Sequence, residues 1–265
     1  EDSDIKNPEN PVLTVCDGSI SFENVSFSYS EKSERKTLEN INLNIKSGET
    51  VGVIGATGSS KTSLIQLVSR LYDVTEGSVR VGGVDVRDYD VKKLRDAVSV
   101  VLQKNVLFSG TVSENLRWGN KDATDEEIRR ACILAQADDF VSAMPDGYET
   151  MIERGGTNVS GGQKQRLCIA RAILKKPKIL IFDDSTSAVD TKTDSLIRKA
   201  LREEIPDTTK IIIAQRISSV QDADKIIVLD NGTINGIGTH DELVETNEIY
   251  REVFETQTKA GDFDD

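Results

Sequence analysis

The apolar positions of the chain form short runs of strand length that alternate with stretches of helical spacing. The runs at 51–54 and 211–213 are continuous, whereas residues 41–45 alternate between apolar and polar side chains. Continuous runs are typical of strands buried on both faces, and alternation is typical of strands buried on one face. The pattern predicts strands at 20–27, 41–45, 51–54, 79–81, 98–102, 179–182, 211–213 and 226–229.

Helical spacing separates several of these strands. One helix is predicted to begin near Ser60, and its apolar face holds Leu64, Val68 and Leu71. Another is predicted to end at Pro206, which cannot continue a helix, and its apolar face holds Leu196, Ala200 and Leu201. Strands that alternate with helices predict an α/β fold in which a mainly parallel sheet has helices on both faces.

The middle of the chain has a different character. Residues 105–170 are mostly of helical pattern, and Thr124 with Glu127 forms a capping box ahead of an apolar-periodic segment. We interpret 105–170 as an inserted helical subdomain. The expected organisation is a linker at 1–16, one folded domain at 17–258 and a disordered acidic tail at 259–265.

Charge and cysteine content narrow the class of protein. The 265 residues carry a formal net charge of −12, which argues against nucleic acid or an anionic membrane surface as the main partner. No apolar stretch approaches the roughly 20 residues that span a bilayer. The three cysteines show neither disulfide nor metal spacing, and Cys132 lies on an apolar helical face. We expect a reduced, cytosolic chain.

A glycine-containing loop joins the strand at 51–54 to the helix that follows, the context that a phosphate-binding loop requires. Its backbone N–H groups and the helix N-terminus would hold the β-phosphate. Lys61 would reach the β- and γ-phosphate oxygens, and the Thr62 hydroxyl would bind Mg²⁺. The residues predicted to bind ATP here are Gly55, Ala56, Thr57, Gly58, Ser59, Ser60, Lys61, Thr62 and Ser63.

Two positions qualify this prediction. Ser60 stands where the motif has glycine, and serine can take that place if the local backbone is near helical, because only a positive φ strictly favours glycine. Asp183 and Asp184 follow the apolar run at 178–182, so a buried strand would bring two carboxylates to the nucleotide. Asp183 would hold Mg²⁺ through water.

The segment 158–163, Asn-Val-Ser-Gly-Gly-Gln, is the strongest motif in the chain. Ser160 and Gln163 form a second capping box, so a helix begins here and its free N–H groups make another anion site. Together with the phosphate loop and the Asp183 strand, this segment resembles the signature motif of ATP-binding cassette (ABC) ATPases. The resemblance extends from Ile20 to about Phe254, and the signature residues are Ser160, Gly161, Gly162 and Gln163.

The resemblance implies an α/β P-loop NTPase core with an antiparallel β subdomain and an inserted α-helical subdomain. It also implies roles for further residues. Tyr29 would stack on adenine, and Gln103 would bind Mg²⁺ with Thr62 and Asp183. The loop with Ser187, Ala188 and Asp190 would cross to a partner subunit. The segment 151–155, with Glu153 and Arg154, resembles the part of ABC exporters that contacts the transmembrane domains.

Two residues at predicted catalytic positions differ from those that the family has there. Asp184 stands where the family has the glutamate general base, and Gln215 where it has the histidine that contacts the γ-phosphate. A carboxylate stem shortened by about 1 Å can reduce a rate about a hundredfold. Glutamine cannot carry the proton that histidine can. The only histidine, His240, follows the last predicted strand, and we interpret it as a surface or capping residue.

In this family two cassettes pack head to tail, and each ATP lies between the phosphate loop of one and the signature helix of the other. The resemblance therefore implies that this chain binds ATP and Mg²⁺, hydrolyses ATP poorly at its own site, and completes the site of a non-identical partner. The closest family type is a heterodimeric multidrug exporter, with the cassette at the cytoplasmic face of the cell membrane.

Other classes of function remain open from the sequence. A non-hydrolytic ATP-gated interaction module shares the departures at Asp184 and Gln215. Soluble ABC proteins that act on ribosomes would need two cassettes in one chain, and nucleic-acid ABC ATPases would need a long coiled-coil insertion. The 265 residues and the net charge of −12 fit neither of the last two. The transported substrate is not encoded in this segment.

Overall fold

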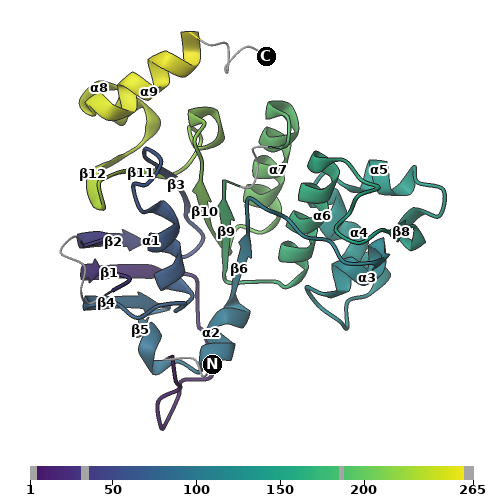
Figure 1. Ribbon diagram of the computed structural model, residues 1–265, viewed down its shortest axis with the longest axis horizontal. Coiled ribbons are helices and arrows are strands. Elements are labelled where there is room, and N and C mark those ends of the chain that lie inside the picture. Colours follow the sequence, from purple (N-terminus) through teal and green to yellow (C-terminus); the bar gives the residue numbers. More distant parts are fainter. Residues whose placement is uncertain (1–4, 31–35, 185–187, 260–265) are drawn as a thin grey trace.

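The computed structural model describes residues 5–30, 36–184 and 188–259. Two sheets and an inserted group of helices organise this part of the chain (Figure 1). The antiparallel β subdomain lies on one side of the view, the helical subdomain on the other, and the larger sheet between them. This arrangement confirms the predicted fold class.

The larger sheet has six strands in the order β12-β11-β3-β10-β9-β6, and only the pairing of β11 with β12 is antiparallel. Every residue of β3 and β10 is buried, which explains their continuous apolar sequences. The strands of this sheet are β3 (Thr50–Ile54), β6 (Val98–Val101), β9 (Ile179–Asp183), β10 (Thr209–Ile213), β11 (Lys225–Asp230) and β12 (Thr233–Gly238).

The smaller sheet is antiparallel, in the order β2-β1-β4-β5. Its strands are β1 (Ile20–Phe27), β2 (Leu38–Ile45), β4 (Glu76–Val81) and β5 (Val84–Asp85). The pairing of β1 with β2 shifts register between Phe22 and Val25, yet both of these side chains stay buried. The irregular apolar spacing of β1 therefore reflects a local break in the ladder.

Helix α1 (Lys61–Val68) packs on one face of the larger sheet, together with the smaller sheet. The predicted extension of its apolar face to Leu71 is wrong, because the helix ends at Val68 and Leu71 is 46% exposed. Arg70 has a φ of 49°, which ends helical geometry, and Arg95 donates to its carbonyl oxygen at 2.7 Å.

The helical subdomain contains α3 (Val112–Arg117), α4 (Asp125–Leu134), α5 (Asp138–Ser142), α6 (Gly161–Leu174) and a two-stranded ribbon of β7 (Gly110–Thr111) with β8 (Met151–Ile152). The predicted capping boxes at Thr124 and Ser160 are both present. Cys132 is fully buried on α4, and burial raises the pKa of its thiol to about 12. Its prediction as a core residue is confirmed.

Four further α-helices of the described residues lie outside the helical subdomain and follow α1 in the sequence. They are α2 (Val91–Ala97), α7 (Thr191–Glu204), α8 (His240–Thr246) and α9 (Glu248–Lys259), with short 3-10 turns η1 (Val86–Asp88), η2 (Gly147–Glu149) and η3 (Ile217–Ser219). His240 does not cap α8, because Thr239 does. Its Nδ1 lies 2.8 Å from the Tyr250 hydroxyl of α9, and its ring is half-buried against Phe254.

Part of the predicted linker contacts the folded domain. Val12 forms a parallel bridge with Tyr89, and Val15 is buried in the core shared by the two sheets. The linker boundary at residue 16 stays a prediction. The predicted tail at 259–265 lies, beyond Lys259, outside the described residues.

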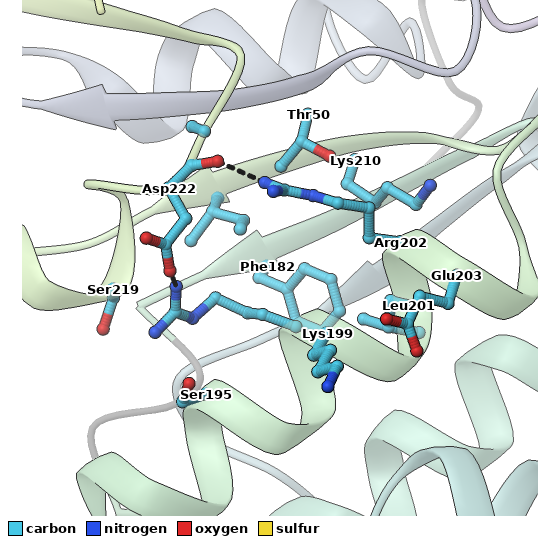
Figure 2. Close-up of a pocket in the computed structure, with 13 residues that line it drawn as sticks. Thr50, Phe182, Ser195, Lys199, Leu201, Arg202, Glu203, Lys210, Ser219 and Asp222 are labelled. Atoms are coloured by element: carbon cyan, nitrogen blue, oxygen red, sulfur yellow. Dashed lines mark hydrogen bonds and ion pairs between the residues drawn. The ribbon is translucent and has the colours of Figure 1, made fainter. Parts of the chain in front are cut away.

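A cavity of about 320 Å³ opens between α7 and the larger sheet, beside Phe182 and Ile212. Figure 2 shows Arg202 extending from α7 to Asp222, where it binds the carbonyl oxygen. Arg198 contacts the Asp222 carboxylate at 2.8 Å, and the Lys210 ammonium donates to the carbonyl oxygen of Ile205 at 2.7 Å. Lys210 thus holds a carbonyl at the C-terminal end of α7, a favourable position for a cation.

Lys210 should make stability rise with pH above neutrality. The residue is 3% exposed, and burial, assisted by Arg202, lowers the pKa of its ammonium to about 8. Between about pH 8 and 10.5 the unfolded chain keeps a proton that the native state has lost, so the free energy of unfolding increases with pH. At about 1.4 kcal/mol per pH unit the gain is at most about 3 kcal/mol.

Urea unfolding of the native chain and of Lys210→Met at pH 7.5, 9 and 10 measures this effect. The difference in unfolding free energy between the two proteins should grow with pH in favour of the native chain. Other titrating groups are common to both proteins and cancel in that difference. A difference that stays constant with pH would show that Lys210 keeps an ordinary pKa.

Candidate ATP site

The phosphate loop runs directly from β3 into α1, as the sequence predicts. The Lys61 ammonium lies against the loop, with Gly55 O at 2.5 Å, Ala56 O at 3.0 Å and Ser59 Oγ at 3.3 Å. Burial lowers the pKa of Lys61, while Asp184 and Asp183 raise it. The Lys61 ammonium therefore lies close enough to Asp183 and Asp184 to interact with their charges, and a phosphate bound in the loop would interact with it too.

The backbone at Ser60 is not near helical, so the condition under which serine would replace glycine easily is not met. Its φ is 73° and ψ 22°, which is left-handed, and its side chain makes no capping hydrogen bond. The loop geometry is thus the one that favours glycine, and serine adopts it at a cost of about 1 kcal/mol. The turn geometry of the loop thus overrides the backbone preference of the serine.

Ser60→Gly should stabilise the chain by about 0.5–1 kcal/mol, because glycine adopts a positive φ without the steric cost. Thermal unfolding monitored by circular dichroism measures the change. Ser69→Gly at the other end of α1 is the matched control, since Ser69 has a φ of −89° and should lose stability. Equal destabilisation by both changes would contradict the strain at Ser60.

Two of the residues predicted to bind Mg²⁺, Thr62 and Asp183, come together at the end of β9. The Thr62 hydroxyl lies 3.4 Å from both carboxylate oxygens of Asp183. Burial raises the pKa of Asp183, and a hydrogen bond from Thr62 partly opposes this. Oxygen ligands in small number are what Mg²⁺ prefers when substrate phosphates complete its shell. This arrangement fits a nucleotide-bound Mg²⁺ held by Thr62, by Gln103 and, through water, by Asp183.

Asp184 lies at the centre of a cluster of amide groups. Its Oδ2 accepts hydrogen bonds from Gln215 Nε2 at 2.8 Å and from Gln103 Nε2 at 3.2 Å. Its backbone is left-handed, with a φ of 47°, and its N–H donates to the Ile213 carbonyl at 2.9 Å. The two predicted catalytic positions are therefore in direct contact, and Gln103, predicted to bind Mg²⁺, contacts the same carboxylate oxygen.

Tyr29 lies at the edge of the smaller sheet, just after β1. It is 54% exposed, and its hydroxyl lies 2.8 Å from Ser63 Oγ and 2.9 Å from Gln66 Oε1 of α1. Its ring meets Phe27 and Tyr72 edge to face, with centroids 4.8 and 5.0 Å away. An exposed aromatic ring fixed beside the phosphate loop provides a stacking surface for a base.

The signature residues lie on the opposite face of the larger sheet from α1. Leu180, Phe182 and Ile212 pack in the core that contains α6, whereas their neighbours Ile181, Ile211 and Ile213 pack in the core that contains α1. Ser160 caps α6 through Gln163 N at 3.1 Å, and Ser160 and Gly161 are exposed. The start of α6 is therefore exposed to solvent, on a helix that packs in a different core from α1.

The predicted crossing loop lies against this helix start. Ala188 N–H donates to Gln165 at 3.3 Å, and Asp190 caps α7 through Thr193 N at 2.9 Å. A Cβ atom on Gly162 would lie 3.0 Å from the Ala188 carbonyl oxygen, so glycine permits this approach. Ser187, also predicted in this loop, lies outside the described residues.

Glu153 and Arg154, the predicted coupling residues, are exposed just after β8. The loop is ordered by Asn158, which accepts from Glu153 N at 2.9 Å and donates to the Met151 carbonyl oxygen at 2.8 Å. A cavity of about 370 Å³ lies nearby between β6 and α6, bordered by Phe108 and Trp118. These two exposed rings stack with centroids 4.8 Å apart. Sequence reasoning missed them because no periodic pattern surrounds them.

Comparison with known families agrees with this geometry. A profile of the ABC transporter family matches residues 38–187. The chain belongs to the ABC transporter family. It is 44% identical over 240 residues to the putative multidrug export ATP-binding/permease protein YgaD of Bacillus subtilis, covering 91% of this chain and 41% of that protein. It is 43% identical over 258 residues to a putative multidrug export ATP-binding/permease protein of Staphylococcus aureus, covering 97% and 44%.

A solved structure of a bacterial Atm1-family ABC exporter with ATP bound superposes with a TM-score of 0.90 at 35% identity. That match covers 96% of this chain and 44% of the other. The chain thus spans less than half the length of the ABC relatives it matches. Among the described residues no helix is long and apolar enough to cross a membrane.

Proposed function

We propose that this chain is the MgATP-binding domain of an ABC exporter of the multidrug type. It would act at the cytoplasmic face of the cell membrane and pair head to tail with a second, non-identical ABC subunit. The names of its relatives as putative multidrug export proteins and the exporter fold support this proposal. ATP binding and hydrolysis would power export of a substrate chosen by transmembrane domains.

The chain's own site would bind ATP well and hydrolyse it slowly. The contact between Asp184 and Gln215 at 2.8 Å carries this part of the proposal. A general base needs a free carboxylate oxygen at the attacking water, and aspartate is about 1 Å shorter than the glutamate of the family. Gln215 supplies an amide that carries no transferable proton. In contrast, Lys61 lies against the phosphate loop and Thr62 lies near Asp183, which supports retained binding of phosphate and Mg²⁺.

The signature helix would serve the partner's ATP. Ser160 and the exposed start of α6 offer N–H groups to an anion that approaches from outside the chain. Because α6 and α1 lie on opposite faces of the larger sheet, this anion would belong to the facing subunit. One chain would then contribute binding groups to one site and a complete signature to another.

The transmembrane domains would dock near the predicted coupling segment. Phe108, Trp118 and Met151 are 43%, 69% and 57% exposed around the β7–β8 ribbon and α3. Exposed aromatic residues grouped beside charged ones such as Glu153 and Arg154 are typical of protein interfaces. This surface supports an exporter role over that of a soluble module.

Nucleotide binding and turnover of the purified chain test the proposal. We expect calorimetry to show MgATP binding that Lys61→Ala abolishes, with turnover near background. Addition of the cognate partner should give turnover, because the partner's site then receives this chain's signature. Brisk hydrolysis by the chain alone would contradict the degenerate site. Absence of turnover with the partner would instead favour a non-hydrolytic ATP-gated module.

A further inference from the structure

The loop that carries Gln215 is held by a side chain from the C-terminal helix. Gln257 of α9 donates from Nε2 to the Gln215 carbonyl oxygen at 2.7 Å and accepts from Ile217 N–H at 2.8 Å through Oε1. One carboxamide therefore binds the backbone on both sides of Arg216. Such two-point contact fixes a peptide segment in orientation as well as in position.

Helix α9 is itself firmly attached to the core. Tyr250 is fully buried and bonds to His240 at 2.8 Å. Val253 and Phe254 pack against the same hydrophobic cluster that contains Ile217. The base of the Gln257 side chain is thus fixed by packing, so its amide transmits the position of α9 to the loop.

The contacts continue from this loop to the ATP site. The backbone of Gln215 receives the Gln257 hydrogen bond, and the side chain of Gln215 donates to Asp184 Oδ2 at 2.8 Å. Asp184 in turn accepts from Gln103 at 3.2 Å. Four residues from α9, the loop after β10, the end of β9 and the loop after β6 form one continuous series of hydrogen bonds.

We infer that Gln257 is a positioning residue for the γ-phosphate end of the ATP site, acting through Gln215. The inference rests on the proposed function, since it assumes that Gln215 faces the γ-phosphate. It makes the C-terminal helix part of the nucleotide sensor, although α9 contributes no group to the phosphate loop. Displacement of α9 would reduce the preference for ATP over ADP without weakening the binding of ADP.

Two variants separate the two hydrogen bonds. Gln257→Ala removes both, whereas Gln257→Glu keeps an acceptor for Ile217 N–H but loses the donor to Gln215 O. Thr258→Ala is the control on the same helix, because the Thr258 hydroxyl donates only within α9, to Phe254 O at 2.8 Å. Each protein is studied as the full 265-residue chain.

Calorimetry with MgATP and MgADP gives the ratio of the two affinities, and hydrogen exchange with mass spectrometry follows the Ile217 amide. Loss of one ordinary hydrogen bond should speed exchange at Ile217 about two- to tenfold in Gln257→Ala but not in Gln257→Glu. The preference for ATP over ADP should fall about threefold or more in both variants and stay unchanged in Thr258→Ala.

An unchanged ratio of ATP to ADP affinity in Gln257→Ala overturns the inference, even if exchange at Ile217 becomes faster. That result would show a hydrogen bond that only stabilises the loop. In Gln257→Ala, a changed ratio with unchanged exchange at Ile217 overturns the inference also, because the effect would then not pass through this loop. If the native chain binds no MgATP, the proposed function fails first and the inference fails with it.

Discussion

Replacing Asp184 by glutamate together with Gln215 by histidine should raise hydrolysis at this chain's own site by about a hundredfold. Glutamate moves the carboxylate about 1 Å further, beyond the amides that now bind it, to where a base can reach the attacking water. Histidine supplies a ring that can donate to the γ-phosphate and carry a proton. A hundredfold gain corresponds to about 2.7 kcal/mol of transition-state stabilisation.

The measurement needs turnover from one site only. Steady-state ATPase assays of the assembled exporter, with the partner's own base removed, report on this chain's site. Each single substitution should give much less than the pair, because Asp184 and Gln215 are in contact and act together. Asp122→Glu with Gln221→His makes the same chemical changes elsewhere and should have no effect. Unchanged turnover in the double variant would show that another step limits this site.

Replacing Ser160 by arginine should abolish hydrolysis at the partner's site. The serine hydroxyl caps α6, and the exposed N–H groups beside it are where the partner's γ-phosphate would bind. A long side chain there would fill the position of the phosphate and keep the two subunits apart. We expect the turnover of the assembled exporter to fall about a hundredfold or more.

This change should leave MgATP binding to the isolated chain intact, since α6 and α1 lie on opposite faces of the sheet. Ser142→Arg is the matched control, because Ser142 is exposed on α5 of the same subdomain. It should affect turnover little. Normal turnover in Ser160→Arg would contradict the assignment of the signature helix to the partner.

The strands and the phosphate loop could be predicted because their signals are local. Val51 to Ile54 is a continuous apolar run that ends in glycine, and the capping boxes at Thr124 and Ser160 depend on residues three apart. The residues at which helices end were harder to predict. Leu71 continues the helical spacing of α1, but a left-handed residue at Arg70 ends the helix. The β12 strand was not predicted, because Thr233–Gly238 contains two glycines and few apolar residues. Helices α8 and α9 were not predicted either.

The cluster around Asp184 depends on tertiary structure. Gln103, Asp184 and Gln215 are far apart in the sequence, and only the pairing of β9 with β6 and β10 brings them together. The residue type at Ser60 gave no sign of strain, whereas the loop imposes a positive φ there. The contact of Gln257 with the Gln215 loop has no sequence signal at all, since it joins the unpredicted helix α9 to a loop 42 residues earlier in the chain.

The alternation of buried residues along β9 constrains position 183, which lies in the strand, but not position 184, which lies beyond it. Ile181 and Phe182 point into different cores, so a deletion of one residue in the strand would exchange them and turn Asp183 away from Mg²⁺. Asp184 lies one residue past the end of β9 and outside that ladder. Its side chain can change without disturbing either core. A substitution at position 184 is therefore a change that the fold tolerates, and related chains can differ in chemistry at this position while they keep the same architecture.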